Sequence, residues 1–312
     1  MTEAKRQIFM QLLISVRMGL AEKTQAGLIS EVDAAATFIM LDALEDGRFH
    51  FAAETWHDAA PGRGADFYPS ELLLRARTLK DETIKPFGPI NTLSQAGLQE
   101  DFDKAIILAG IDQALRKGQM PISINTSARN MKSAEFWQGI RDLIDTHFDG
   151  KDIFGRLTFE VTEDDLADNP CREVLLKMKY DMGCTFAIDD FYHDRAAHIK
   201  SNDGIDSNDW KRLDNLRGIV DYVKIDGETI EASLREGFDL QPLIDQIKKY
   251  VPDAHIITER VENAEQAYLL ANAYGVDAVQ GLYLTEDRKE FQNDLRQAAA
   301  NCGPQPKYDC KL

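Results

Sequence analysis

The sequence has no long hydrophobic run, and this absence excludes a membrane-spanning helix. A span needs about 20 consecutive apolar residues, and no apolar stretch of this chain approaches that length. The apolar segment at residues 8–16 contains Gln11 and is soon followed by Arg17, without a small-residue cleavage site. It therefore does not match a secretory signal peptide, and we expect a cytoplasmic protein.

Cysteine is scarce and acidic residues outnumber basic ones, and both features limit the kinds of ligand that the protein can bind. The four cysteines, Cys171, Cys184, Cys302 and Cys310, lack the close spacing of a metal-binding motif, so we expect reduced thiols. The 36 Lys and Arg residues against 53 Asp and Glu residues give a net charge of −17. This acidity argues against a groove for polymeric nucleic acid, which binds by counterion release. A small phosphate ligand stays compatible, because bound divalent ions can reverse the local potential.

The remaining sequence alternates between strand-like and helix-like segments. Short apolar or β-branched runs predict strands at 49–54, 71–75, 122–126, 157–162, 184–189, 221–226, 255–259 and 277–283. Helical periodicity predicts helices at 97–117, 132–147, 170–182, 240–250 and 263–274. Eight strands with intervening helices predict an α/β fold, a TIM-barrel-like (β/α)8 barrel with its active site at the C-terminal strand ends. A doubly wound open sheet competes, but its usual glycine-rich phosphate loop is missing.

The N-terminal region is helical by pattern and precedes the barrel signal. Residues 4–22 place apolar side chains on one face. We expect this helix to pack on the domain or on a second subunit, with binding to a membrane surface as the alternative. Ser30 and Asp33 resemble a capped helix start, and Gly47 resembles a stop. The expected organisation is a helical extension at 1–40, a barrel domain at 41–300 and a tail at 301–312.

Oxygen-bearing side chains recur at or beside the apolar runs. They are Glu71, Asn125, Glu160, Asp189, Asp190, Asp226, Glu259 and Gln280. Acidic groups gathered at one mouth of a barrel repel one another strongly in a low dielectric, so such a cluster is tolerated when a cation binds it. Ligands that offer oxygen alone favour Mg²⁺ or Mn²⁺. The residues themselves therefore predict a site for one of these ions.

Seven short motifs follow one another around these polar residues. They are Glu71-Leu72-Leu73-Leu74-Arg75, Asn125-Thr126-Ser127, Phe159-Glu160-Val161-Thr162-Glu163, Ile188-Asp189-Asp190-Phe191, Asp221-Tyr222-Val223-Lys224-Ile225-Asp226, Thr258-Glu259-Arg260-Val261-Glu262 and Gln280-Gly281. In this order they resemble the EAL family of cyclic di-GMP phosphodiesterases, with Leu72 in place of the family's alanine. Any one motif is a weak signal, but seven in order are specific. The resemblance implies an EAL-type barrel, in which the first strand can run antiparallel to the next.

The resemblance also implies metal-assisted hydrolysis of one phosphodiester bond, which opens cyclic di-GMP to linear pGpG. Two Mg²⁺ or Mn²⁺ ions would hold the attacking water and neutralise the phosphate. By resemblance, the first ion would take Glu71, Asn125, Glu160 and Asp189, and the second would take Asp189, Asp190 and Glu259. Cyclic di-GMP is thus the expected partner, and self-association as a homodimer is a further expectation.

Four further residues match family positions near the reaction. Lys224 matches the lysine that orients and activates the water, and Gln280 matches the glutamine of the same water network. Glu163 matches a residue that holds the loop after the paired aspartates. Arg75 matches the arginine that contacts the substrate phosphate, where its forked donors suit two oxygens at once.

Four departures from the family pattern bear on activity. Glu54 stands where the family has a glutamine, an amide expected near a guanine. Tyr192 and Arg260 stand where the family has glycines. The segment 191–218 is a long polar insertion where the family has a short Gly/Ser-rich loop, and loops of that length are usually functional or mobile.

Two other functions stay open. A catalytically idle EAL-like module could bind cyclic di-GMP or a protein partner as a receptor or regulator, which the altered Glu54 and the rebuilt 191–218 segment favour. The barrel could also act on another phosphodiester or phosphorylated metabolite, because a fold alone does not fix the substrate. The enzyme is the leading hypothesis, since every metal position carries the expected residue type.

Overall fold

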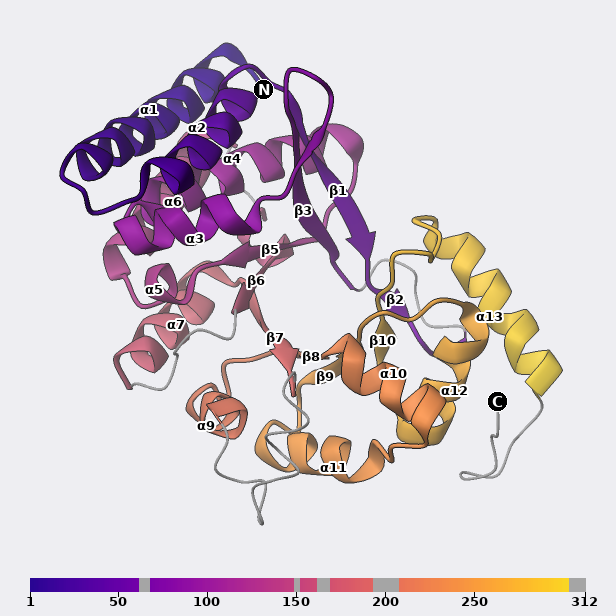
Figure 1. Cartoon of the computed structure of the whole chain (residues 1–312). Coiled ribbons are helices and arrows are strands. Elements are labelled where there is room, and N and C mark those ends of the chain that lie inside the picture. The colour runs from indigo at the N-terminus through magenta and orange to yellow at the C-terminus, as the bar shows by residue number, and fades with distance from the viewer. Residues whose placement is uncertain (62–67, 149–151, 162–168, 193–207, 303–312) are drawn as a thin grey trace.

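The chain folds into a barrel of strands wrapped by helices, as a computed structural model shows (Figure 1). The structure describes residues 1–61, 68–148, 152–161, 169–192 and 208–302. The strands are β1 (Phe49–Thr55), β2 (His57–Asp58), β3 (Ser70–Arg77), β4 (Thr83–Ile84), β5 (Ile122–Thr126), β6 (Leu157–Val161), β7 (Thr185–Phe191), β8 (Tyr222–Ile225), β9 (His255–Thr258) and β10 (Ala278–Val279). The helices are α1 (Glu3–Gln25), α2 (Glu31–Glu45), α3 (Phe87–Ala96), α4 (Gln99–Lys117), α5 (Ala128–Met131), α6 (Ala134–His147), α7 (Asn169–Met182), α9 (Asn208–Asn215), α10 (Gly227–Glu236), α11 (Gln241–Tyr250), α12 (Ala264–Tyr274) and α13 (Arg288–Cys302), with a short 3₁₀ turn at Phe154–Arg156.

The strands form one sheet that curls into a nearly closed barrel. Their order is β1-β3-β5-β6-β7-β8-β9-β10-β2, with β4 beside β3. Neighbouring strands from β3 to β10 are parallel, whereas β1 runs antiparallel to β3 and β2 antiparallel to β10. Because Trp56 alone separates β1 from β2, the two ends of the sheet belong to one chain segment. The predicted barrel is confirmed, including its antiparallel first strand.

Alternating side chains divide the strands between the barrel interior and the outer layer. On β8, Val223 and Ile225 join the large core beneath the helices, whereas Tyr222 belongs to a separate small cluster. That cluster comprises Trp56, Tyr68, Ala187, Tyr222, Ile257 and Ala278. Side chains fill the interior of an eight-stranded barrel in this way, so it is a packed core and not a pore. The Nζ atom of Lys224 lies 5.5 Å from the centre of the Trp56 ring, so polar residues adjoin this cluster.

Helices α1 and α2 cover the side of the barrel away from α13 (Figure 1). The side chain of Thr2 accepts the N–H of Lys5 at the start of α1. At the start of α2, the side chain of Ser30 accepts the N–H of Asp33, and this helix start was predicted from the sequence. Helix α1 packs against α4, and α2 packs against α3. The buried face of α1 consists of Phe9, Leu13, Val16 and Leu20. Among the described residues, no helix combines the length and hydropathy needed to cross a bilayer.

Several elements differ from the sequence-based expectation. Helices α3, α5, α9, α10 and α13 and strands β2 and β4 lie in stretches where no element was predicted. The last expected strand, 277–283, is limited to β10, because the chain turns after Val279 and the backbone N–H of Gln280 bonds to Thr258. Strand β7, in contrast, is longer than expected at its end, because it continues to Phe191 and the predicted strand ended at residue 189.

Candidate functional site

The predicted site residues meet at one mouth of the barrel. Six lie near or just past the carboxyl ends of parallel strands: Asn125, Glu160, Asp189, Lys224, Glu259 and Gln280. Glu71 differs, because it is the second residue of β3 and not near its end. The stagger between barrel strands accounts for its place beside Lys224, 153 residues further along the chain.

The ammonium group of Lys224 lies at the centre of this site. Its Nζ atom is 2.7 Å from Glu160 Oε2, 2.7 Å from Asp189 Oδ1, 2.9 Å from Glu259 Oε1 and 3.1 Å from Glu71 Oε2. The side chains of Lys224 and Glu160 are 2% and 0% exposed. One positive charge thus faces four carboxylates, so the cluster carries excess negative charge when all four are ionised.

Burial and mutual repulsion shift the protonation of the cluster. Burial would lower the pKa of Lys224, but the carboxylates around it, Asp189 foremost, raise that pKa well above its usual value. Burial and repulsion from Glu71 raise the pKa of Glu160, against the attraction of Lys224. Burial raises the pKa of Glu259 to about 8, with Lys224 again opposing. Burial would raise the pKa of Asp189 as well, but Lys224 outweighs it and the pKa is lowered. The metal-free site therefore retains protons that a bound cation would displace.

Two carboxamides and a further carboxylate extend the network. Nδ2 of Asn125 donates to Glu71 Oε1 at 2.7 Å. Nε2 of Gln280 donates to Glu71 Oε2 at 2.7 Å and to Glu54 Oε2 at 3.3 Å. Oε1 of Glu54 lies 3.7 Å from Nη2 of Arg75. The predicted phosphate-binding arginine is therefore paired with the carboxylate that replaces the family's glutamine.

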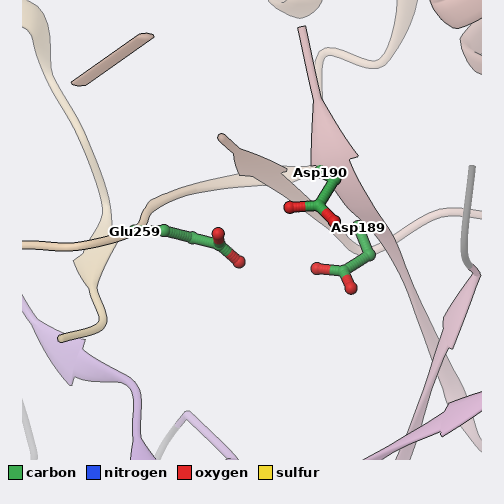
Figure 2. A group of neighbouring side chains, drawn as sticks. All are labelled: Asp189, Asp190 and Glu259. Atoms are coloured by element: carbon green, nitrogen blue, oxygen red, sulfur yellow. The ribbon is translucent and has the colours of Figure 1, made fainter. Parts of the chain in front are cut away.

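Three carboxylates form a group that could hold a metal ion (Figure 2). One oxygen from each of Asp189, Asp190 and Glu259 lies within 4.8 Å of the other two. The side chains point into the same space, two from the end of β7 and one from the segment after β9 (Figure 2). Hard divalent cations bind oxygen-only sets of this kind. The residues present therefore fit Mg²⁺ or Mn²⁺.

Two hollows adjoin the site and share Asp190. A cavity of about 540 Å³ is lined by Glu71, Asp189, Asp190, Lys224, Glu259 and Gln280, among others. A second cavity, of about 610 Å³, is lined by Arg75, Asn125 and Asp190 together with apolar side chains such as Phe87 and Ile90. Both volumes lie in the range of small-molecule sites. Polar groups and an apolar wall thus lie next to each other at this mouth.

Two of the sequence departures occupy left-handed backbone positions. Tyr192 has a φ of 70° and Arg260 a φ of 53°. This region favours glycine, which is the residue expected at both positions. The side chain of Arg260 packs against Gly227. A Cβ atom added at Gly227 would lie 2.3 Å from the Cγ and Cδ atoms of Arg260. Arg260 also lines the cavity of about 540 Å³, so the substitution adds a charged side chain to the site's wall.

The structure brings together most, but not all, of the predicted residues. Glu163 and positions 193–207 of the insertion lie outside the described residues. Sequence reasoning missed Ser123, whose hydroxyl donates to Glu160, and Arg212 on α9, whose guanidinium donates to the carbonyl oxygen of Asp189. Strand alternation could have found Ser123, because it precedes Asn125 by two residues and faces the same side.

Comparisons with known proteins place this arrangement in a family. The EAL domain family model matches residues 39–287. The structure of the FimX EAL domain from Pseudomonas aeruginosa bound to c-di-GMP is 21% identical, with a TM-score of 0.62 over 80% of this chain and 95% of that one. The PaMucR phosphodiesterase in complex with c-di-GMP is 21% identical, with a TM-score of 0.60 over 81% of this chain and 96% of that one. An EAL domain protein from Listeria monocytogenes EGD-e is 23% identical, with a TM-score of 0.57 over 79% of this chain and 91% of that one.

These structural similarities, all at low identity, show the shared fold. A search of curated proteins finds no match. The family model, by contrast, covers most of the chain, from the middle of α2 to the residue before α13. This chain belongs to the EAL domain family.

Proposed function

We propose that this chain is a metal-dependent phosphodiesterase that hydrolyses cyclic di-GMP to linear pGpG. The observation that carries the proposal is the convergence on Lys224 of carboxylates from β3, β6, β7 and the segment after β9. Family membership supports the reaction, and the c-di-GMP bound to the FimX and PaMucR structures supports the substrate. The expected cytoplasmic location and homodimer stay predictions.

The proposed metal ligands follow the family pattern. One ion would take Glu71, Asn125, Glu160 and Asp189, and the other would take Asp189, Asp190 and Glu259. When bound, Mg²⁺ or Mn²⁺ would supply Lewis-acid polarisation of the phosphate and activation of a water molecule. The amide nitrogen of Asn125 already donates to Glu71, which leaves its amide oxygen as the atom suited to a cation.

Lys224 and Gln280 have roles that their contacts define. In the metal-free site, the nearby carboxylates outweigh burial and raise the pKa of Lys224. We assign Lys224 to orienting and activating the attacking water, and its contacts with four proposed ligand carboxylates support this role. Gln280 holds Glu71 through its Nε2 atom. The proposed loop-holding role of Glu163 concerns a residue outside the described part of the chain.

Arg75 would bind a substrate phosphate through its forked donors. Its guanidinium lies near Glu54, so a bound phosphate has to displace this carboxylate from the guanidinium or share the guanidinium with it. That contact favours a second candidate function, in which the protein binds cyclic di-GMP as a receptor without turnover. A weakly engaged phosphate would be compatible with binding but would not be aligned for reaction.

The test is to incubate purified protein with MgCl₂ or MnCl₂ and cyclic di-GMP, and to follow the products by chromatography. We expect pGpG from the native protein and none from Glu71→Ala or Lys224→Ala. The exposed residues Glu22 on α1 and Lys117 at the end of α4 line neither cavity at the site, so they supply matched controls, and their alanine variants should retain turnover. Binding of cyclic di-GMP without formation of pGpG would favour the receptor function. If the protein neither binds nor hydrolyses cyclic di-GMP, the assignment of this substrate is refuted. Replacing the metal by CaCl₂ should suppress turnover, because the larger, looser coordination of Ca²⁺ misplaces the water.

A further inference from the structure

The strand end that presents Asp189 and Asp190 has an irregular backbone. Asp190 and Tyr192 have left-handed φ angles of 47° and 70°. Strand β7 also changes register against β8 between Ile188 and Phe191. Left-handed backbone is unfavourable for residues other than glycine, so surrounding contacts have to hold this segment in place.

Helix α9, which lies inside the long insertion, supplies two hydrogen bonds to the segment. Nη2 of Arg212 donates to the backbone carbonyl oxygen of Asp189 at 2.7 Å. A carboxylate oxygen of Asp209, one turn earlier on α9, accepts the backbone N–H of Tyr192 at 3.1 Å. Arg212 and Asp209 also lie within 3.5 Å of each other. The two ends of the irregular segment are thus fixed by two neighbouring side chains of one helix.

Packing adds to these hydrogen bonds. The ring of Trp210 on α9 meets Phe191 edge-on, with the ring centres 5.2 Å apart. From α10, the hydroxyl of Thr229 donates to the carbonyl oxygen of Tyr192 at 3.0 Å. Phe191 and Trp210 are both buried. The helix of the insertion is therefore part of the wall behind the metal-binding group, and not a separate surface feature.

Arg212 also places a permanent positive charge behind Asp189. The arginine is 3% exposed, and a guanidinium stays protonated throughout the working pH range. This charge attracts the carboxylate of Asp189, in addition to the hydrogen bond from Nη2 to the Asp189 carbonyl oxygen.

We propose that Arg212 is a positioning residue that fixes Asp189 for divalent-metal binding through its hydrogen bond to the Asp189 carbonyl oxygen. This inference rests on the proposed function, because it takes Asp189 as a metal ligand. It assigns a task to the insertion that the family resemblance left unexplained. Groups that orient metal ligands from behind typically change metal affinity by about 10- to 100-fold when they are replaced.

The experiment measures Mn²⁺ binding, without substrate. Metal-free protein is titrated with MnCl₂ by isothermal titration calorimetry for the native chain, Arg212→Met, Arg212→Lys and the control Arg217→Met. Arg217 is exposed, lies just beyond α9 and pairs with Asp214, so its variant removes the same charge without touching Asp189. We expect Arg212→Met to weaken Mn²⁺ binding about 10- to 100-fold, Arg212→Lys to recover part of this loss, and Arg217→Met to bind within about twofold of the native chain.

The outcomes separate this inference from the proposed function. If the native chain binds no Mn²⁺, the metal assignment itself fails and this inference fails with it. If the native chain binds Mn²⁺ and Arg212→Met binds equally well, only the role of Arg212 is refuted, even where its melting temperature falls. Circular dichroism establishes that each variant is folded before titration. Should Arg212→Met not fold, Arg212→Lys and Asp209→Asn decide the question, since native-like affinity in both would overturn the proposal.

Discussion

The ammonium nitrogen of Lys224 lies 2.7 Å from a carboxylate oxygen of Glu160, and both side chains are almost fully buried. A buried ion pair gains little stability on its own, because desolvation offsets the attraction, but removing one partner leaves a costly unpaired charge. Removing Lys224 would leave more than one buried charge unpaired, because three more carboxylates face the same ammonium. The metal-free protein therefore depends on Lys224 for stability, apart from the role that we propose for this residue in the reaction.

Lys224→Met should destabilise the metal-free protein by about 3–5 kcal/mol, because it removes the charge that the buried carboxylates share. Excess MnCl₂ should restore part of this loss, since a bound cation replaces the missing positive charge. Urea unfolding followed by circular dichroism, in EDTA and in MnCl₂, measures both quantities. The control Lys117→Met lies at the exposed end of α4 and should change the free energy of unfolding by no more than about 0.5 kcal/mol. Equal effects of the two variants would contradict this account.

Glu259 should make the metal-free protein less stable as pH rises. Burial raises its pKa in the folded state to about 8 from an ordinary value of 4.5. The folded chain therefore keeps a proton that the unfolded chain releases between these values, so the stabilising contribution of protonation is lost as pH rises through this window. Glu259→Gln mimics the protonated form and should show a weaker fall in unfolding free energy from pH 4.5 to pH 8. Urea titrations in EDTA across this range provide the measurement.

Two results would speak against the assignment to Glu259. One is an identical pH dependence in the native chain and Glu259→Gln. The other is a Mn²⁺ affinity that does not rise with pH up to about 8, because metal binding requires the carboxylate to lose its proton. Glu265→Gln, on the exposed face of α12, is the matched control and should leave the pH profile unchanged.

His57 should make the protein sensitive to acid. Its ring stacks on Phe291, with the ring centres 4.3 Å apart, and burial together with the charge of Arg288 lowers its pKa from 6.5 to about 4. In the unfolded chain, His57 binds a proton below pH 6.5, whereas in the folded chain it binds one only below about pH 4. The free energy of unfolding therefore falls as pH drops across this window. The loss should reach about 3 kcal/mol.

The variant His57→Phe keeps the ring stack and removes the titration. Between pH 6.5 and pH 4, the free energy of unfolding should therefore decrease less for this variant than for the native chain. His147→Phe, at the half-exposed end of α6, serves as the control and should follow the native profile. An unchanged acid response in His57→Phe would assign the sensitivity to other groups.

The strand positions and most site residues could be predicted from the sequence, because both follow from local patterns. The run 122–126 forms β5 as expected, and Asn125 follows from its place near the end of that strand. On β8, apolar Val223 and Ile225 face the helices while Lys224 faces the interior, as a period of two requires. These inferences need only neighbouring residues.

The centre of the site could not be predicted in the same way, because it depends on barrel closure. Lys224 and Glu71 are 153 residues apart, and their contact depends on the stagger of strands around the barrel. Arg212 is 3% exposed, although it lies in a polar insertion whose pattern predicts no helix and no buried face. Its burial arises from the tertiary packing of α9, in which Arg212 donates to the carbonyl oxygen of Asp189 and Trp210 contacts Phe191. No local periodicity encodes these contacts.

Glu54→Gln should improve the engagement of cyclic di-GMP if the proposed reaction is correct. The carboxylate of Glu54 lies 3.7 Å from Nη2 of Arg75, with side-chain exposures of 21% and 36%. A partly exposed pair of this kind is worth about 0.2–1 kcal/mol, so a neutral amide should lower the KM for cyclic di-GMP by up to about fivefold. The kcat value should change little, because the groups around Lys224 stay in place and Gln280 retains its bond to Glu71.

Steady-state kinetics with MnCl₂, or calorimetric binding where turnover is absent, gives the comparison between Glu54→Gln and the native chain. Glu262→Gln is the matched control, because Glu262 lines the same cavity of about 540 Å³ but pairs with Arg235 and not with Arg75. An equal gain in both variants would show a general effect of removing negative charge from the cavity. A higher KM in Glu54→Gln would show instead that the carboxylate binds the substrate, as it could through the N–H donors of a guanine edge.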